Sequence, residues 1–165
     1  MNLVRGAVIV LVVAAVFIAV VVLGKANPTK TAASAPVELT GVTMDGQPFD
    51  LASTRGKPTV INFWASWCKY CRNEAPELVA FAKAHPEAAF VGVDVQDEPA
   101  DAQAFVTEFG IPFPSVIDPD GAISQQFGIT GYPTTIFLDS SGVEVDRIIG
   151  QGSTARFEAG LVKAQ

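Results

Sequence analysis

The sequence predicts a three-layer α/β domain with a mixed central sheet and an N-terminal β-hairpin, preceded by one transmembrane helix. Three observations lead to this prediction. An uncharged apolar run extends from Gly6 to Gly24. After it, apolar segments typical of buried strands alternate with segments of helical pattern, and the chain ends in a further hairpin and a helix. Such alternation is typical of a sheet that is covered by helices.

The apolar run is long enough to cross a bilayer. As a helix, residues 6–24 would span about 28 Å, close to the hydrocarbon thickness of a membrane. The run exceeds the ~7–15 residues of a signal-peptide core, and Gly24 and Ala26, on either side of Lys25, make a weak cleavage site. A buried globular helix is the alternative, but such a helix is rarely apolar on every face. We therefore expect an uncleaved signal anchor.

The charges that flank this anchor are nearly balanced and do not set its orientation. Arg5 and the terminal amine lie on one side, and Lys25 and Lys30 lie on the other. A single N-terminal anchor usually exports the domain behind it, so we expect a single-pass cell-membrane protein whose C-terminal domain is extracytoplasmic. The expected segments are a cytoplasmic N-terminus at 1–5, the anchor at 6–24, a small-residue linker at 25–36 and the folded domain at 37–165.

Composition limits the partners of the domain. The net charge of −6 argues against a nucleic-acid surface. The domain is long enough to bury a core of its own. No glycine lies inside the anchor between Ala7 and Leu23, so no helix-dimer motif is present there and we expect a monomer.

The first half of the domain is predicted to contain a hairpin, two strands and a helix. Asp45-Gly46 is a turn signal between two short extended segments. Residues 59–65 and 89–95 are apolar nearly throughout, which suits strands covered on both faces. An apolar stripe from Leu78 to Ala82 indicates a helix, which Pro76 should kink. The expected bounds are 37–42 and 48–51 for the hairpin, 59–65 and 89–95 for the strands, and about 68–84 for the helix.

The second half of the domain is predicted to continue the alternation of helices and strands and to end in a hairpin and a helix. Pro99 suits the first turn of a helix. The turn 118–121 ends a short strand, and 140–142 joins the two strands of a hairpin. Ser153 is a good N-cap for the last helix. The expected bounds are 99–109, 123–127 and 153–163 for helices, and 115–117, 134–138 and 143–149 for strands.

Both cysteines of the chain lie in the segment SWCKYCR, residues 66–72. A structural disulfide between them would close too small a loop to stabilise the fold much. A zinc site would need four ligands, and the only histidine, His85, is expected at the surface. A two-cysteine copper site remains open, as does coincidence. The fourth interpretation is a redox-active dithiol.

The placement of the pair favours the redox interpretation. Cys68 lies where a buried strand ends and a helix begins, so unpaired N–H groups and the helix dipole favour its thiolate. Cysteines in such CxxC sites have pKa values of roughly 3.5–7.5, against about 8.5 for a free thiol. Cys68 can then attack a substrate disulfide, and Cys71, one turn later, can resolve the mixed disulfide.

The segment NFWASWCKYCRNEAP resembles the active-site segment of the thioredoxin superfamily, and Gly131-Tyr132-Pro133-Thr134-Thr135 resembles its proline loop. The anchor, the early hairpin and the insertion around 96–115 are similar to the TlpA/ResA-like branch. The resemblance covers residues 37–163 and implies a thioredoxin-like fold. It also implies the function of this branch, whose members are extracytoplasmic thiol–disulfide oxidoreductases, several of which reduce apocytochrome c before haem attachment.

The resemblance implies a role for each matched residue. Cys68 would be the nucleophile, Cys71 the resolving thiol, and Pro133 a cis proline that faces the disulfide. Tyr132 and Thr134, on either side of this proline, would contact an extended substrate. No metal and no cofactor is expected besides the Cys68–Cys71 disulfide itself.

Three residues around the cysteines are expected to contribute to substrate binding. Trp67 would shape the substrate-facing rim. Lys69 would favour the thiolate electrostatically, and Tyr70 would add a stacking surface. The pair Lys69-Tyr70 departs from the many relatives that have proline before the second cysteine, and this dipeptide helps to set the redox potential.

A further departure concerns the buried carboxylate near the cysteines. Standard thioredoxins have a buried aspartate in the preceding strand, where this chain has Asn62. The ResA-like branch has a glutamate three residues after the second cysteine, and Glu74 matches it. Glu74 would share a helix face with Cys71, raise thiol pKa values by repulsion and relay protons. The alternative is a first-turn acid that favours the helix dipole.

The function expected from these residues is that of an anchored thiol–disulfide oxidoreductase, a reductant of disulfide-containing protein substrates such as apocytochrome c. A membrane electron-donor thiol protein would recharge it. One alternative is a thiol peroxidase, although Trp67 stands where the threonine-rich loop of those enzymes leads into their cysteine. Another is a Cu(I) metallochaperone, for which a third ligand is missing.

Overall fold

A computed structural model describes residues 35–165 of the chain. The predicted N-terminus and anchor, and nearly all of the predicted linker, lie outside the described residues. Within the described part, no helix combines the length and the hydropathy that crossing a membrane requires.

Five strands form the central sheet in the order β5-β4-β3-β6-β7. Strands β4 and β5 run parallel to β3, whereas β6 is antiparallel to β3 and β7 is antiparallel to β6. Every residue of β3 is buried because this strand has neighbours on both edges and is covered on both faces. The bounds are Thr59–Trp64 for β3, Ala89–Val95 for β4, Ser115–Asp118 for β5, Thr134–Leu138 for β6 and Glu144–Ile149 for β7.

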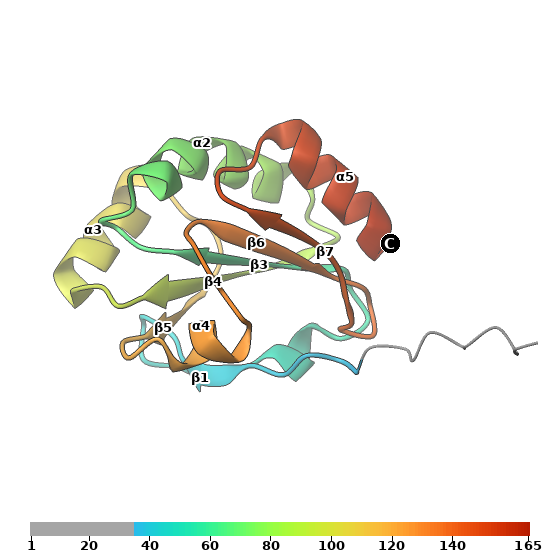
Figure 1. Cartoon of the computed structure of the whole chain (residues 1–165), viewed down its shortest axis with the longest axis horizontal. Helices are drawn as coiled ribbons and strands as arrows, with labels where there is room; N and C mark the ends of the chain where they lie inside the picture. The colour runs from blue at the N-terminus through green and yellow to red at the C-terminus, as the bar shows by residue number, and fades with distance from the viewer. Residues whose placement is uncertain (1–34) are drawn as a thin grey trace, which may run out of the picture. The chain divides into compact units, whose positions relative to one another are not determined.

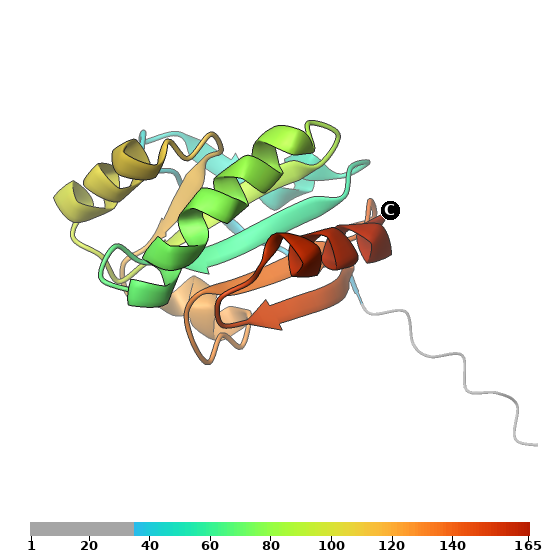
Figure 2. The same ribbon diagram turned by 90° about the horizontal axis from the view of Figure 1, so that it is seen from above.

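Helices and a small second sheet cover the two faces. Figures 1 and 2 show α2 and α5 side by side over one face, with α3 beside α2. The hairpin and α4 lie on the opposite face (Figure 1). The bounds are Lys69–Ala84 for α2, Pro99–Phe109 for α3, Ala122–Gln126 for α4, Thr154–Ala164 for α5, Thr40–Val42 for β1, Pro48–Asp50 for β2 and Leu51–Thr54 for the 3₁₀ helix η1. The predicted thioredoxin-like α/β fold with a mixed sheet is confirmed.

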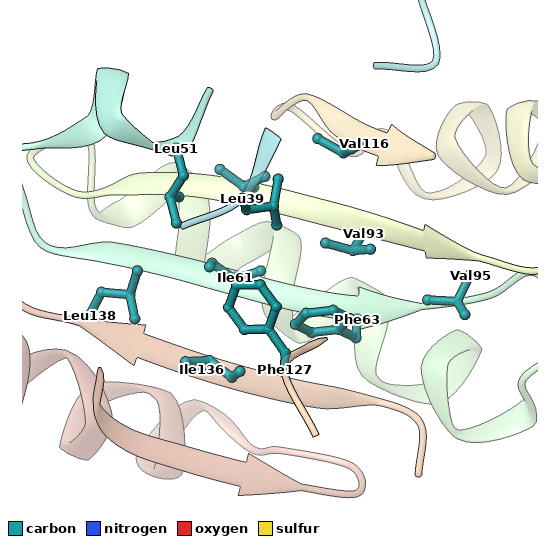
Figure 3. Close-up of a cluster of buried hydrophobic side chains, with 11 residues drawn as sticks. Leu39, Leu51, Ile61, Phe63, Val93, Val95, Val116, Phe127, Ile136 and Leu138 are labelled. Atoms are coloured by element: carbon teal, nitrogen blue, oxygen red, sulfur yellow. The ribbon is translucent and has the colours of Figure 1, made fainter. Parts of the chain in front are cut away.

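Alternate side chains of the strands pack into cores on the two faces of the sheet. Ile61 and Phe63 point into a core beneath the hairpin and α4, which Figure 3 shows. Val60, the neighbour of Ile61 in β3, faces the opposite side of the sheet and a core beneath α2 and α5. This alternation follows from the period of two along a strand. Helix α5 can approach the sheet closely at Gly160, where a Cβ atom would lie 2.5 Å from the Phe137 ring.

Some element boundaries differ from the prediction because aspartate side chains bind nearby backbone N–H groups. Leu51 starts η1 instead of ending β2, since the Asp50 carboxylate accepts a hydrogen bond from Ala52 N. Asp118 belongs to β5, and its carboxylate accepts from the N–H groups at the start of α4. Ser153 does occupy the N-cap position of α5, but its side chain makes no capping bond.

Candidate active site

The two cysteines form a disulfide at the start of α2. Cys68 is the N-cap residue of this helix, and its Sγ accepts a hydrogen bond from Cys71 N at 3.1 Å. The Cα atoms are 5.2 Å apart. Only 6% of Cys68 and 3% of Cys71 is exposed. A thiolate on Cys68 would therefore meet the positive end of α2 and at least one backbone N–H donor.

Aromatic side chains surround the disulfide on the solvent side. Trp67 and Tyr70 are each 58% exposed. The Trp67 ring meets Tyr132 edge-on, with 5.9 Å between the ring centroids, and its Nε1 donates to Gln96 O at 3.2 Å. Lys69 is also exposed. The three residues predicted to lie around the cysteines are thus open to a substrate, whereas Tyr132 of the proline loop is half-buried.

The proline loop lies next to the disulfide. Tyr132 contacts the hydrophobic cluster that contains both cysteines. The Tyr132–Pro133 peptide bond is cis, as the resemblance implied. The loop is held at its far end by Gly150 N, which donates to Pro133 O at 2.8 Å. The side chain of Thr134 is buried and donates to Gly131 O, so it holds the loop instead of facing a substrate.

Glu74 is buried directly behind the disulfide, with 2% of the residue exposed. Its Oε1 accepts from Asn62 Nδ2 at 2.9 Å, and its Oε2 accepts from Gly152 N. Asn62 Nδ2 also donates to Thr135 Oγ1 at 3.0 Å. Asn62 therefore holds the Glu74 carboxyl in position, a role that its place in the sequence did not indicate. The alternative, a first-turn acid that favours the helix dipole, is wrong, because the first turn of α2 contains no acidic residue.

The surroundings of Glu74 place its titration near neutral pH. Burial is the main cause that raises its pKa from 4.5 to about 7. The hydrogen bonds from Gly152 and Asn62 lower the pKa, and the charge of the nearby Glu77 carboxylate raises it. Cys71 and Glu74 line the same internal space of about 10 Å³, close to the lower limit for one water molecule. The carboxyl can hold or release a proton beside Cys71.

Asp97 is a further residue of the site that sequence reasoning missed. It lies just before α3, and its carboxylate accepts hydrogen bonds from both N and Oγ of Ser66, with an Oγ–Oδ1 distance of 2.7 Å. Ser66 is in the turn that leads to Cys68. Its position in the sequence could have indicated this role. Asp97 follows the end of a buried parallel strand, so it lies at the same edge of the sheet as the cysteines.

The described residues offer no metal centre beside the disulfide. Within 35–165, no three His, Cys, Asp or Glu side chains are grouped so as to hold a metal ion. His85 bonds to Glu87 and Glu158, at 2.8 and 3.0 Å, and its ring lies against Phe81 at the end of α2 opposite the cysteines.

Comparison with known proteins identifies relatives over most of the chain. The Redoxin family model matches residues 25–161. Soluble secreted antigen MPT53 of Mycobacterium tuberculosis is 38% identical over 132 residues, which cover 79% of this chain and 76% of MPT53. Thiol-disulfide oxidoreductase ResA of Bacillus anthracis is 29% identical over 122 residues, 73% of this chain and 70% of ResA.

A solved structure of a disulfide oxidoreductase has the same fold as this chain. The crystal structure of a secreted Mycobacterium tuberculosis disulfide oxidoreductase, described as homologous to E. coli DsbE, superposes with a TM-score of 0.70. The two chains are 31% identical, and the match covers 75% of this chain and 94% of the other.

Proposed function

The chain belongs to the Redoxin family, within the thioredoxin superfamily, and is a thiol–disulfide oxidoreductase; from this premise we propose that it is a membrane-anchored reductant of protein disulfides outside the cytoplasm. The observation that carries the proposal is the Cys68–Cys71 pair at the start of α2, with Glu74 buried behind it. Two relatives that are described as secreted support the location. The apolar run 6–24 supports the anchor.

The proposed reaction transfers two electrons from the reduced enzyme to the substrate. The Cys68 thiolate attacks one sulfur of a substrate disulfide, and the other substrate sulfur leaves as a thiolate. Cys71 then loses its proton and attacks Cys68 Sγ, which releases the second substrate thiolate and forms the enzyme disulfide. The substrate disulfide is reduced, and the enzyme dithiol is oxidised.

Glu74 is suited to the proton transfer in the second step. As a carboxylate it can accept the proton of Cys71, and with a pKa of about 7 it can return that proton near neutral pH. Its negative charge also disfavours a thiolate beside it. Repulsion of this kind destabilises the reduced form, which makes the dithiol a better electron donor and supports the reductant direction.

The exposed surface around the disulfide suits an extended polypeptide. Trp67 and Tyr70 offer aromatic faces, and the cis-proline loop lies beside them. Aromatic side chains bind many sequences because their contacts are mainly apolar. We propose apocytochrome c as a substrate and a membrane thiol protein as the electron donor, both on the resemblance to the TlpA/ResA-like branch.

A redox titration tests the proposal. The purified protein is equilibrated with thiol–disulfide buffers, and its reduction potential is read from the fraction oxidised. A value near or below that of thioredoxin, about −270 mV, supports a reductant. A value near that of the strong periplasmic oxidant, about −120 mV, would make the protein a disulfide-forming enzyme instead.

A further inference from the structure

The loop between β7 and α5 contacts two parts of the active site. Gly150 N donates to Pro133 O at 2.8 Å, and Gly152 N donates to Glu74 Oε2. Gly152 is buried and tightly packed, because a Cβ atom on this residue would lie 2.3 Å from the Phe157 ring of α5 and 3.2 Å from Glu74 Oε2. The position of the Gly152 N–H therefore depends on how α5 begins.

The start of α5 is held by a side chain of another helix. Ser153 occupies the N-cap position, but its side chain makes no capping bond. Instead, Glu77 of α2 supplies the acceptor: its Oε2 accepts from Thr154 N at 2.7 Å and from Thr154 Oγ1 at 3.1 Å. A carboxylate at this place satisfies a free N–H group of the first turn and meets the positive end of the helix dipole. Helix α2 thus caps α5, which lies beside it (Figure 2).

Glu74 and Glu77 are three residues apart and share one face of α2. Their carboxyl groups accept from backbone N–H groups that are two residues apart where the chain enters α5: Gly152 bonds to Glu74, and Thr154 bonds to Glu77. Glu74 is only 2% exposed, whereas Glu77 and Thr154 are exposed. The outer hydrogen bond can therefore be altered without opening the core around the inner one.

Glu77 affects Glu74 in two opposite ways. Its negative charge disfavours a second carboxylate, which raises the pKa of Glu74. By holding the start of α5, it also keeps the Gly152 N–H on Glu74 Oε2, and this hydrogen bond lowers the pKa. In the described part of the chain, the walls of the space that Glu74 shares with Cys71 contain no other charged side chain, because Asn62 is neutral and the remaining walls are apolar or aromatic.

We propose that Glu77 is a positioning residue of the oxidoreductase, which fixes the first turn of α5 so that the Gly152 N–H holds the Glu74 carboxyl for proton transfer with Cys71. The inference rests on the proposed function, in which Glu74 accepts the proton of Cys71. It adds that the pH at which this transfer occurs is set from outside the core, by a contact between two helices at the surface.

Two substitutions of Glu77 separate its charge from its hydrogen bonds. Glu77→Gln removes the charge, but its amide oxygen can still accept from Thr154, so the pKa of Glu74 should fall slightly. Glu77→Ala removes the charge and the hydrogen bonds, so the Gly152 bond to Glu74 should weaken as well. The pKa of Glu74 in Glu77→Ala should therefore lie about one unit above its value in Glu77→Gln.

The titration is measured on the oxidised full-length protein, in which the cysteines are joined as a disulfide and do not titrate. Glutamate is labelled with carbon-13 at Cδ, and the pH dependence of the Glu74 signal gives its pKa. Loss of the signal in Glu74→Gln identifies it. Glu98→Ala is the matched control, because Glu98 is an exposed N-cap residue of α3 without a capping bond, and its removal should leave the titration of Glu74 unchanged.

The reaction is followed as the decay of the mixed disulfide between Cys68 and a disulfide-bridged peptide, after rapid mixing and acid quenching at each pH. The pH midpoint of this decay should also be about one unit higher in Glu77→Ala than in Glu77→Gln. Equal Glu74 pKa values in the two variants would overturn the positioning role, whatever the rates.

The remaining outcomes concern the proton transfer and the reaction. If the Glu74 pKa values differ but the two midpoints of decay coincide, Glu74 does not take the proton of Cys71, and the inference is overturned with that step. If the wild-type protein forms no mixed disulfide and reduces no peptide at any pH, the proposed function itself fails.

Discussion

Replacing Glu74 by glutamine should remove a pH-dependent loss of stability from the oxidised protein. The Glu74 pKa is about 7 in the folded state and 4.5 in the absence of burial. Because the folded value is the higher one, the folded protein binds this proton more tightly than the unfolded chain does. The stability that this gives is fully present below pH 4.5, and it is lost as the pH rises to about 7.

The size of the loss follows from the two pKa values. From 4.5 to about 7, at roughly 1.4 kcal/mol per pH unit, the free energy of unfolding should fall by about 3 kcal/mol. Glu74 is only 2% exposed, so solvent screens this effect little. Glutamine fits the same space, because the Asn62 amide can turn so that its oxygen accepts from the new amide and from Thr135 Oγ1.

Urea unfolding of the oxidised protein between pH 4.5 and 8.5 measures this effect. The free energy of unfolding of the wild type, minus that of Glu74→Gln, should fall by about 3 kcal/mol across this range. Asp94 titrates in both proteins and cancels in the difference. Glu98→Gln, at an exposed glutamate, is the control and should show almost no pH dependence. If the difference in free energy of unfolding between wild type and Glu74→Gln stays constant with pH, burial does not raise the pKa of Glu74. Glu74 could then not serve as a proton acceptor that titrates near neutral pH.

Other substitutions test the remaining parts of the structure. Burial, together with the Asp97 and Asp118 carboxylates, raises the pKa of Asp94 from 3.8 to about 7, so its stabilisation is also lost as pH rises, and Asp94→Asn should be the more stable protein above pH 7 in the same unfolding experiment. Cys71→Ser should trap the mixed disulfide on Cys68, which mass spectrometry would detect; rapid release of substrate would contradict the assigned roles. Gly160→Ala should cost about 1–3 kcal/mol of stability, because the new methyl group meets the Phe137 ring; unchanged thermal unfolding would show that α5 can shift without strain.

The order of helices and strands and the place of the cysteines were readable from local sequence. Residues 59–65 are apolar nearly throughout, which suits a strand covered on both faces, and β3 ends shortly before the CxxC helix begins. Such features depend on side-chain period and on neighbours within one helical turn, so a short window of sequence contains them. The identity of Cys68 and Cys71 as a redox pair needed only their spacing and this junction.

The environment of those cysteines was decided by tertiary structure. Glu74 receives hydrogen bonds from Asn62 in β3 and from Gly152 before α5, residues that come together only when the sheet has formed. Asp94 lines a cavity whose walls come from the hairpin, α3 and β5. Burial and pairing of a carboxyl depend on strand order and register between distant segments. Local sequence therefore determined which groups can react, and only the folded chain determined their protonation and what lies beside them.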